Sequence, residues 1–304
     1  MTTSLIPELP DDLQRIVFVD LRIDYAFKLI FGTPGNEDLL LHLVQAILPD
    51  KQVASVTLVT QEQLGLRPDS RSSVVDVKCE TGDGSTFIIE MQIKGQDDFS
   101  DRMVFYSSFP IADGLRKGTG PSYRLTPLYM VGITNFIIPG IPTNSDVVNH
   151  YTIRNVKDNG VQFTDSIHYI TVELPKLPPT LPEVKDKPEW IFYTIRNIGD
   201  MTEMPEEYRG SYLEKIFRLT KFAAMNAREQ EEYLARYKRI RDELSGREYE
   251  REQGRAEGRA EGRAEGEQIV SRRYINEMIK LGLPSETIQQ VTGLSAKEIQ
   301  DPIQ

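Results

Sequence analysis

The sequence predicts an α/β domain with a mixed sheet flanked by helices, followed by a charged helical C-terminal extension. Within residues 20–198, segments with apolar residues at helical spacing are separated by short segments that alternate in polarity or are rich in β-branched residues. From about residue 207 the chain is highly charged, and residues 254–266 repeat the tetrad Gly-Arg-Ala-Glu. A chain of 304 residues is long enough for one sizeable domain and such an extension.

Two helices are expected near the start of the chain. Phe27, Ile30 and Phe31 recur at helical spacing, and a second set of apolar residues does the same in 39–48. Asn36 is suited to cap the second helix, which Pro49 ends.

Five strands and two further helices complete the predicted domain. A hairpin is expected because Gly82-Asp83-Gly84 joins two strand-like segments, at 73–81 and 85–95. The other elements are, in order, a strand at 53–63 before the hairpin, a helix at 99–118, strands at 127–136 and 166–174, and a helix at 190–198.

We expect four parts: a domain at 1–205, a charged helical region at 206–253, the repeat as a linker at 254–266, and a small helical tail at 267–304. Glycine at every fourth position costs a helix about 1 kcal/mol per glycine relative to alanine, which favours a solvated, semi-flexible linker. The alternative is a self-association segment that forms a homodimer or higher oligomer. If the repeat is helical, its arginines form one row and its glutamates another, on roughly opposite sides.

The tail is expected to form three short helices with a minimal core, and it resembles a fragment of a helix-turn-helix module. Its last segment, SAKEIQDPIQ, has one basic residue, which favours packing or oligomerisation over DNA binding. The expected core consists of Ile275, Met278, Ile279, Leu281, Ile288, Val291, Leu294 and Ile299.

Composition limits the chemistry that the chain can perform. One cysteine, Cys79, and three histidines exclude a Cys/His zinc site and disfavour Cys–His nucleophilic catalysis. A catalytic metal would therefore be held mostly by carboxylates, which suits Mg²⁺, with Mn²⁺ as the alternative. A single cysteine also allows no disulfide framework within the chain.

A cytoplasmic location is expected, with no membrane partner. The sequence has no run of about 18 apolar residues, and its start lacks a basic region followed by an apolar one. The single cysteine fits a reducing compartment.

The net charge of −10 argues against tight non-specific binding to nucleic acid. The excess lies in residues 1–206, which hold 18 Lys/Arg and 28 Asp/Glu, whereas residues 207–304 hold 18 of each. Divalent metal ions and a local basic strip would have to overcome the repulsion between this domain and a phosphate backbone.

The predicted hairpin carries the clearest chemical signal. Because strand side chains alternate, one face is apolar and the other carries Asp76, Glu90 and Gln92. A three-residue turn would place Asp76 directly opposite Glu90, with Cβ atoms about 4.5–5.5 Å apart. Two carboxylates that close repel each other unless a cation compensates. The alternative is an exposed polar face on an edge hairpin, with Lys78 relieving the charge.

Two helical pairs add groups that suit phosphodiester hydrolysis. Asp24 and Lys28 share one face of the first helix, and Arg102 and Tyr106 share one face of the helix after the hairpin. Metal ions activate water in such reactions, and a basic side chain stabilises the charge that develops. The alternatives are an ordinary Asp24–Lys28 ion pair, an Arg102–Asp98 ion pair and a core role for Tyr106.

The sequence resembles the Rpn family of recombination-promoting nucleases and transposases, a branch of the PD-(D/E)XK nuclease superfamily. The resemblance covers roughly residues 18–200. It is carried by DYAFKLIFG (24–32), VVDVKC (74–79), IIEMQ (88–92), FSDRMVFYSS (99–108) and PLYMVGITNF (127–136), in this order. It implies a restriction-endonuclease-like fold and Mg²⁺-dependent cleavage of DNA.

The resemblance also implies roles for individual residues. Asp76 and Glu90 match the metal-binding acids of the superfamily motif, and Asp24 matches a helical acid that contributes to the metal site. Gln92 stands at the position of the motif lysine, as in the E-x-Q variant of this branch, and its amide could orient water. The residues that match phosphate-contact or supporting positions are Lys28, Arg102 and Tyr106.

These observations predict a metal-dependent DNA endonuclease linked to recombination or mobile elements. The first alternative is a catalytically inactive binding or regulatory module that keeps the nuclease fold. The second is an assembly device in which the tail and the repeat carry the main role and nuclease activity is secondary.

Overall fold

The computed structural model describes residues 16–59, 76–95, 97–117, 125–141, 144–180 and 188–300. The chain forms two compact units, residues 1–238 and 239–304. Among the described residues, no helix is both long enough and apolar enough to cross a membrane.

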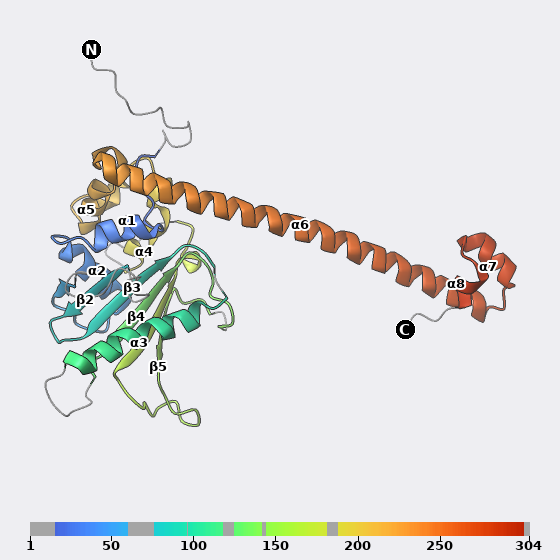
Figure 1. Cartoon of the computed structure of the whole chain (residues 1–304), viewed down its shortest axis with the longest axis horizontal. Helices are drawn as coiled ribbons and strands as arrows, with labels where there is room; N and C mark the ends of the chain where they lie inside the picture. The colour runs from blue at the N-terminus through green and yellow to red at the C-terminus, as the bar shows by residue number, and fades with distance from the viewer. Residues whose placement is uncertain are drawn as a thin grey trace, which may run out of the picture. The chain divides into compact units, whose positions relative to one another are not determined.

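The first unit contains a six-stranded mixed sheet in the order β1-β2-β3-β4-β6-β5 (Figure 1). Strands β3, β4 and β6 run parallel, and antiparallel pairs lie on both sides of them. The bounds are β1 Val56–Leu58, β2 Val77–Thr81, β3 Thr86–Gln92, β4 Leu128–Thr134, β5 Val148–Thr152 and β6 Ile167–Glu173. All seven residues of β4 are buried, as expected for a central strand that is covered on both faces.

The predicted α/β architecture with a mixed sheet and a helical extension is confirmed, with differences in detail. Strand β5 was not predicted, because its half-exposed residues form no clear apolar pattern and pair with β6 through the backbone. The first strand is shorter than predicted. The parts of the predicted elements at 60–63, 73–75 and 118 lie outside the described residues.

The predicted three-residue turn of the hairpin is present. The Gly84 amide donates to the Thr81 carbonyl at 2.8 Å, and the Thr81 amide donates to the Ser85 carbonyl at 2.9 Å. Gly84 has a φ of +84°, a conformation that glycine adopts without steric cost. The Asp83 carboxylate further accepts hydrogen bonds from Thr81 and Ser85, so the turn is fixed by its own side chains.

Helices cover the two faces of the sheet. Figure 1 shows α3 (Phe99–Lys117) lying across one face. The end of α1 (Asp24–Phe31) lies on the opposite face, where a Cβ on Gly32 would lie 3.5 Å from Val77. The remaining helices of this unit include α2 (Glu37–Ile47), α4 (Glu189–Asn197) and α5 (Tyr212–Leu219). Asn36 precedes α2 as predicted, but its side chain donates to the Ile30 carbonyl instead of capping the helix.

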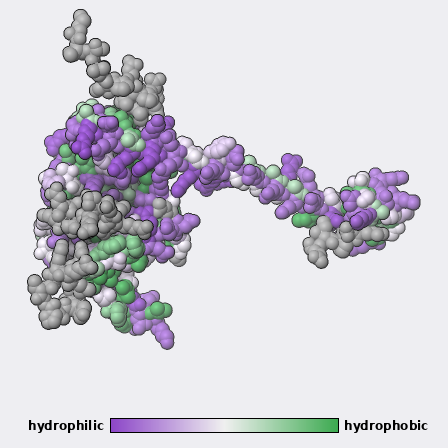
Figure 2. Space-filling model, in the orientation of Figure 1, coloured by the Kyte–Doolittle hydropathy of each residue, from purple (hydrophilic) through white to green (hydrophobic). Residues whose placement is uncertain are grey.

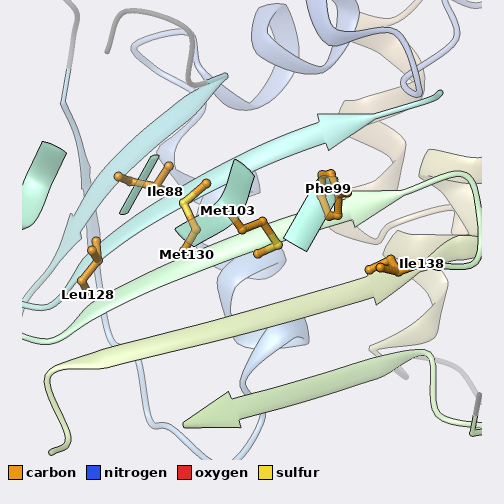
Figure 3. Close-up of a cluster of buried hydrophobic side chains, with 6 residues drawn as sticks. All are labelled: Ile88, Phe99, Met103, Leu128, Met130 and Ile138. Carbon is orange, nitrogen blue, oxygen red and sulfur yellow. The ribbon is translucent and has the colours of Figure 1, made fainter. Parts of the chain in front are cut away.

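The core beneath α3 consists of six buried side chains (Figure 3): Ile88, Phe99, Met103, Leu128, Met130 and Ile138. Gly132 on β4 lies directly under this helix. A Cβ at Gly132 would lie 2.6 Å from a ring atom of Phe99 and 3.1 Å from the sulfur of Met103. The absence of a side chain at this position therefore lets α3 pack against the sheet.

Helix α6 (Ala227–Lys280) runs without interruption through the repeat at 254–266. The secondary structure therefore does not change at either end of the predicted linker. The first unit includes α5 and the beginning of α6, which the sequence assigned to the extension. The division of the chain into a domain, a charged helical region, a linker and a tail remains a prediction.

The second unit ends in α7 (Ser285–Thr292) and α8 (Ala296–Gln300), which follow α6 after a turn at Gly282. Its small core contains Ile275, Ile288 and Ile299, with Met278 and Leu294 packed against them. The prediction that Ile279, Leu281 and Val291 join this core is wrong, because these side chains are exposed. The buried centre takes one side chain from each of α6, α7 and α8, and Met278 and Leu294 pack against it from the side.

Candidate active site

The register of the β2–β3 hairpin brings two acids together. Val77 pairs with Ile89 and Cys79 with Phe87, as the turn length predicted. Continuing this register by one residue places Asp76, which immediately precedes β2, opposite Glu90. The Asp76 carboxylate accepts a hydrogen bond of 2.7 Å from the Met91 amide, which holds the side chain against β3.

Glu90 is buried, with 5% of its surface exposed. One carboxylate oxygen, Oε1, accepts a hydrogen bond of 2.6 Å from Nη2 of Arg102. The other oxygen, Oε2, is buried and has no hydrogen-bond partner within the described part of the chain. The alternative of an exposed polar face on this hairpin is therefore wrong at Glu90, because α3 covers that face and buries Ile88 as well.

The packing of α3 determines which groups meet Glu90. Gly132 pairs with Glu90 in the parallel register of β3 and β4, and Phe99 and Met103 of α3 press against that glycine. Arg102 belongs to the same helix and thus reaches the Glu90 carboxylate. Its guanidinium carbon also lies 5.5 Å from the centre of the Tyr106 ring. Tyr106 is half-buried and packs against the core beneath α3. The ring therefore contacts both the core, as the alternative predicted, and the Arg102 guanidinium.

Both acids are unfavourable as anions in this environment. Burial raises the pKa of Asp76 from the ordinary 3.8 to about 8, and the charges of Glu90 and Asp24 act in the same direction. The Met91 amide and the charge of Lys28 oppose that shift. Burial also raises the pKa of Glu90, against the influence of Arg102. Such acids are stabilised as anions by an additional cation.

Helix α1 contributes an acid and a base near Asp76. The charges of Asp24 and Lys28 both act on the Asp76 carboxyl, in opposite directions. Asp24 also pairs with Arg236 of α6, with Oδ2 and Nη1 2.9 Å apart. Arg236 was not predicted as part of this region. It lies 212 residues further along the chain and has no local motif that connects it to Asp24.

Gln92 ends β3 on the same face as Glu90. Its side-chain amide donates to the Lys94 carbonyl at 3.3 Å, a contact at the long end of hydrogen-bond geometry. A weak contact of this kind leaves the amide able to exchange partners.

The arrangement suits a hard divalent cation held by carboxylates. Asp76 and Glu90 come from neighbouring strands, and the buried Oε2 of Glu90 offers an acceptor. Mg²⁺ prefers oxygen ligands and keeps several waters, so two protein carboxylates suffice to anchor it. The described residues contain no group of three or more His, Cys, Asp or Glu residues placed to hold a metal. Asp24 is therefore near Asp76 without joining a preformed three-acid cluster.

The mixed sheet, the helices on both faces and the acid pair of the hairpin define an α/β protein with a nuclease-like fold. A family model described as PD-(D/E)XK nuclease family transposase matches residues 21–250, and the chain belongs to this family. The family and the fold that the sequence motifs predicted are thus confirmed. Comparisons with curated proteins and with solved structures gave no match.

Proposed function

We propose that this chain is a metal-dependent DNA endonuclease that hydrolyses phosphodiester bonds during recombination or the movement of mobile elements. The observation that carries the proposal is the buried Oε2 of Glu90, which has no hydrogen-bond partner among the residues that the structure describes, on a carboxylate whose charge acts on Asp76. An unsatisfied carboxylate oxygen in a protein interior costs free energy and calls for a ligand. Membership of a nuclease family supports DNA as the substrate.

Asp76 and Glu90 would hold Mg²⁺, or Mn²⁺ in its place. When bound, such an ion lowers the pKa of a bound water and offsets negative charge on the phosphate. Asp24 would add a third acid, directly or through water, once its ion pair with Arg236 opens. That pair is about 40% exposed on both sides, so opening it costs little.

The remaining residues would position water and phosphate. The Gln92 amide both donates and accepts hydrogen bonds, so it can orient a water, but it supplies no positive charge. Lys28 brings positive charge to Asp76 and Arg102 brings it to Glu90, and these groups would attract phosphate oxygens. Tyr106 would hold the Arg102 guanidinium through the contact with its ring.

Cleavage of plasmid DNA by the purified chain tests the proposal. The reactions contain Mg²⁺, Mn²⁺, Ca²⁺ or EDTA, and the variants are Asp76→Ala, Glu90→Ala and Gln92→Ala. Glu80→Ala is the matched control, because Glu80 is an exposed acid on the same hairpin. We expect cleavage with Mg²⁺ or Mn²⁺ that the control retains and the first two variants lose.

Two results would contradict the proposal. One is equal cleavage by the wild type and by Asp76→Ala, which would identify a contaminating nuclease. The other is a DNA product attached to a Tyr or Ser side chain, because hydrolysis by activated water forms no covalent intermediate with the protein.

One observation favours a catalytically inactive binding or regulatory module as the second candidate. Arg102 already compensates Glu90, and Arg236 compensates Asp24, so part of the acid charge is neutralised within the chain. Thermal unfolding with increasing Mg²⁺ distinguishes the two candidates. A metal-binding site predicts a rise in Tm that Glu90→Ala removes, whereas the inactive module predicts no rise.

A further inference from the structure

The repeat at 254–266 forms ordered rows of charge on α6. All of its arginines and glutamates are exposed. Each residue advances an α-helix by about 100°, so residues four apart form rows that turn by about 40° at each step and are inclined to the helix axis. Two helices that pack such rows against each other therefore cross at an angle. Arginine follows each glycine and glutamate precedes the next glycine. The two charged rows therefore flank the glycine row, one on each side.

The charges of the repeat do not satisfy one another within a single helix. Residues four apart carry the same charge, as in Arg255 and Arg259 or Glu257 and Glu261, and such pairs destabilise a helix. Arg263 pairs with Glu267 at 3.2 Å, beyond the end of the repeat. No ion pair joins an arginine to a glutamate of the repeat itself anywhere in the described helix.

The glycines of the repeat are not required by the packing of the single chain. A Cβ added at Gly254, Gly258 or Gly262 would meet nothing within 4 Å. Alanine at each position would favour the helix by about 1 kcal/mol, so the glycine row costs stability in one chain. A row without side chains allows another backbone to approach closely. In Figure 2, no continuous hydrophobic stripe runs along the visible face of α6 to serve as an apolar seam.

We infer that the repeat is a self-association surface for a second copy of this chain, in parallel orientation, with the glycine rows facing each other. In a parallel pair related by a two-fold axis, the arginine row of each helix lies beside the glutamate row of the other. In an antiparallel pair the arginine rows meet each other, and so do the glutamate rows. The charge pattern thus selects the parallel arrangement.

A second copy explains more of the pattern than nucleic acid does. The repeat holds three arginines and three glutamates, so its own net charge is zero. DNA would use the arginine row and would be repelled by the glutamate row. A parallel second copy uses both rows and places the residues before the repeat of both chains at the same end. The inference stands on the repeat alone and does not depend on nuclease activity.

The first experiment measures the mass of the full-length chain by sedimentation equilibrium over a range of concentrations. An acidic variant carries Arg255→Glu, Arg259→Glu and Arg263→Glu. A basic variant carries Glu257→Arg, Glu261→Arg and Glu265→Arg. We expect a wild-type dimer, a dissociation constant weakened about tenfold or more in each variant alone, and restored association when the two are mixed.

A variant with all six substitutions is the matched control. It exchanges the two rows without losing their complementarity, so we expect it to dimerise like the wild type. Helix content is followed by circular dichroism to separate loss of pairing from loss of the helix. A monomeric wild type, unchanged dimerisation of the acidic variant, or no association in the mixture would overturn the inference.

Disulfide formation tests the orientation. Cys79 is buried, so the wild type serves as the control without an accessible thiol. In the parallel arrangement, Gly254→Cys forms a disulfide-linked dimer by itself. In the antiparallel arrangement it links instead to Gly266→Cys of a second chain when the two variants are mixed. The second result would refute the parallel pair even if the chain is dimeric.

Discussion

Arg102 of α3 donates a hydrogen bond of 2.6 Å to one oxygen of Glu90, while the other oxygen of that carboxylate is buried without a partner in the described residues. Arg102 therefore provides a hydrogen bond to only one of the two oxygens of this buried carboxylate. The charge of Glu90 also acts on the Asp76 carboxyl, whose pKa is raised to about 8, mainly by burial. This asymmetry links the stability of the sheet to the chemistry proposed for the site.

Removing the Arg102 guanidinium should destabilise the metal-free protein. Arg102→Met leaves the buried Glu90 carboxylate uncompensated, and we expect a loss of about 3 kcal/mol in the free energy of unfolding. Urea unfolding in EDTA measures this loss. Arg209→Met is the control, since Arg209 forms an exposed ion pair with Glu206 and should cost well under about 1 kcal/mol. Equal effects of the two substitutions would contradict the importance of the buried pair.

The stability of the metal-free protein should fall as the pH rises from about 4 to about 8. Burial raises the pKa of Asp76 from 3.8 to about 8 in the folded state, so the folded chain binds a proton that the unfolded chain has released. Stability decreases with pH wherever the folded state binds more protons. Urea unfolding across this range in EDTA measures the decrease, which Asp76→Asn should flatten. Val156→Ala, at an exposed position without a titratable group, should leave the slope unchanged.

Added Mg²⁺ should raise the Tm more at pH 8 than at pH 5. The proposed ligand Asp76 must lose its proton to bind the ion, and its raised pKa places that loss near the upper end of this range. Thermal unfolding with and without Mg²⁺ at the two pH values measures the difference. A metal-induced rise that is independent of pH, or that persists in Asp76→Asn, would argue against this residue as a ligand.

Gly132→Ala should disturb the packing of α3. The new Cβ would lie 2.6 Å from a ring atom of Phe99, so the helix or the ring must move, at a cost of about 1–3 kcal/mol. Urea unfolding measures the cost, and Phe99→Leu in the same chain should recover part of it. Gly246→Ala in α6 is the control, because its Cβ would meet nothing within 4 Å. A neutral Gly132→Ala would show that α3 accommodates a methyl group there.

Tyr233→Phe should weaken the packing of the start of α6 against the rest of the first unit. The buried Tyr233 hydroxyl accepts a hydrogen bond of 2.9 Å from the Asp20 amide, and its removal leaves that amide unsatisfied. We expect a loss of about 1–3 kcal/mol in the free energy of unfolding, measured with urea. Tyr274→Phe is the control, because Tyr274 is 64% exposed. Equal losses in the free energy of unfolding at the two positions would contradict a stabilising role for the buried Tyr233–Asp20 hydrogen bond.

The sequence by itself determined the features that depend on neighbouring residues. Turn length and side-chain alternation are local properties, and they were enough to predict the hairpin register that brings Asp76 and Glu90 together. Helical spacing likewise predicted α1 and α2. Local reasoning about the helix propensity of glycine favoured a semi-flexible linker at the repeat. The structure instead places the repeat inside one continuous helix.

Only the tertiary structure decided how the acids are surrounded. The pairing of Asp24 with Arg236 joins residues that no local pattern connects. The burial of Glu90 and its contact with Arg102 depend on α3 approaching Gly132, a contact between segments that are separate in sequence. Local patterns fix which side chains share a face, whereas desolvation and ion pairing depend on what the rest of the chain packs against that face.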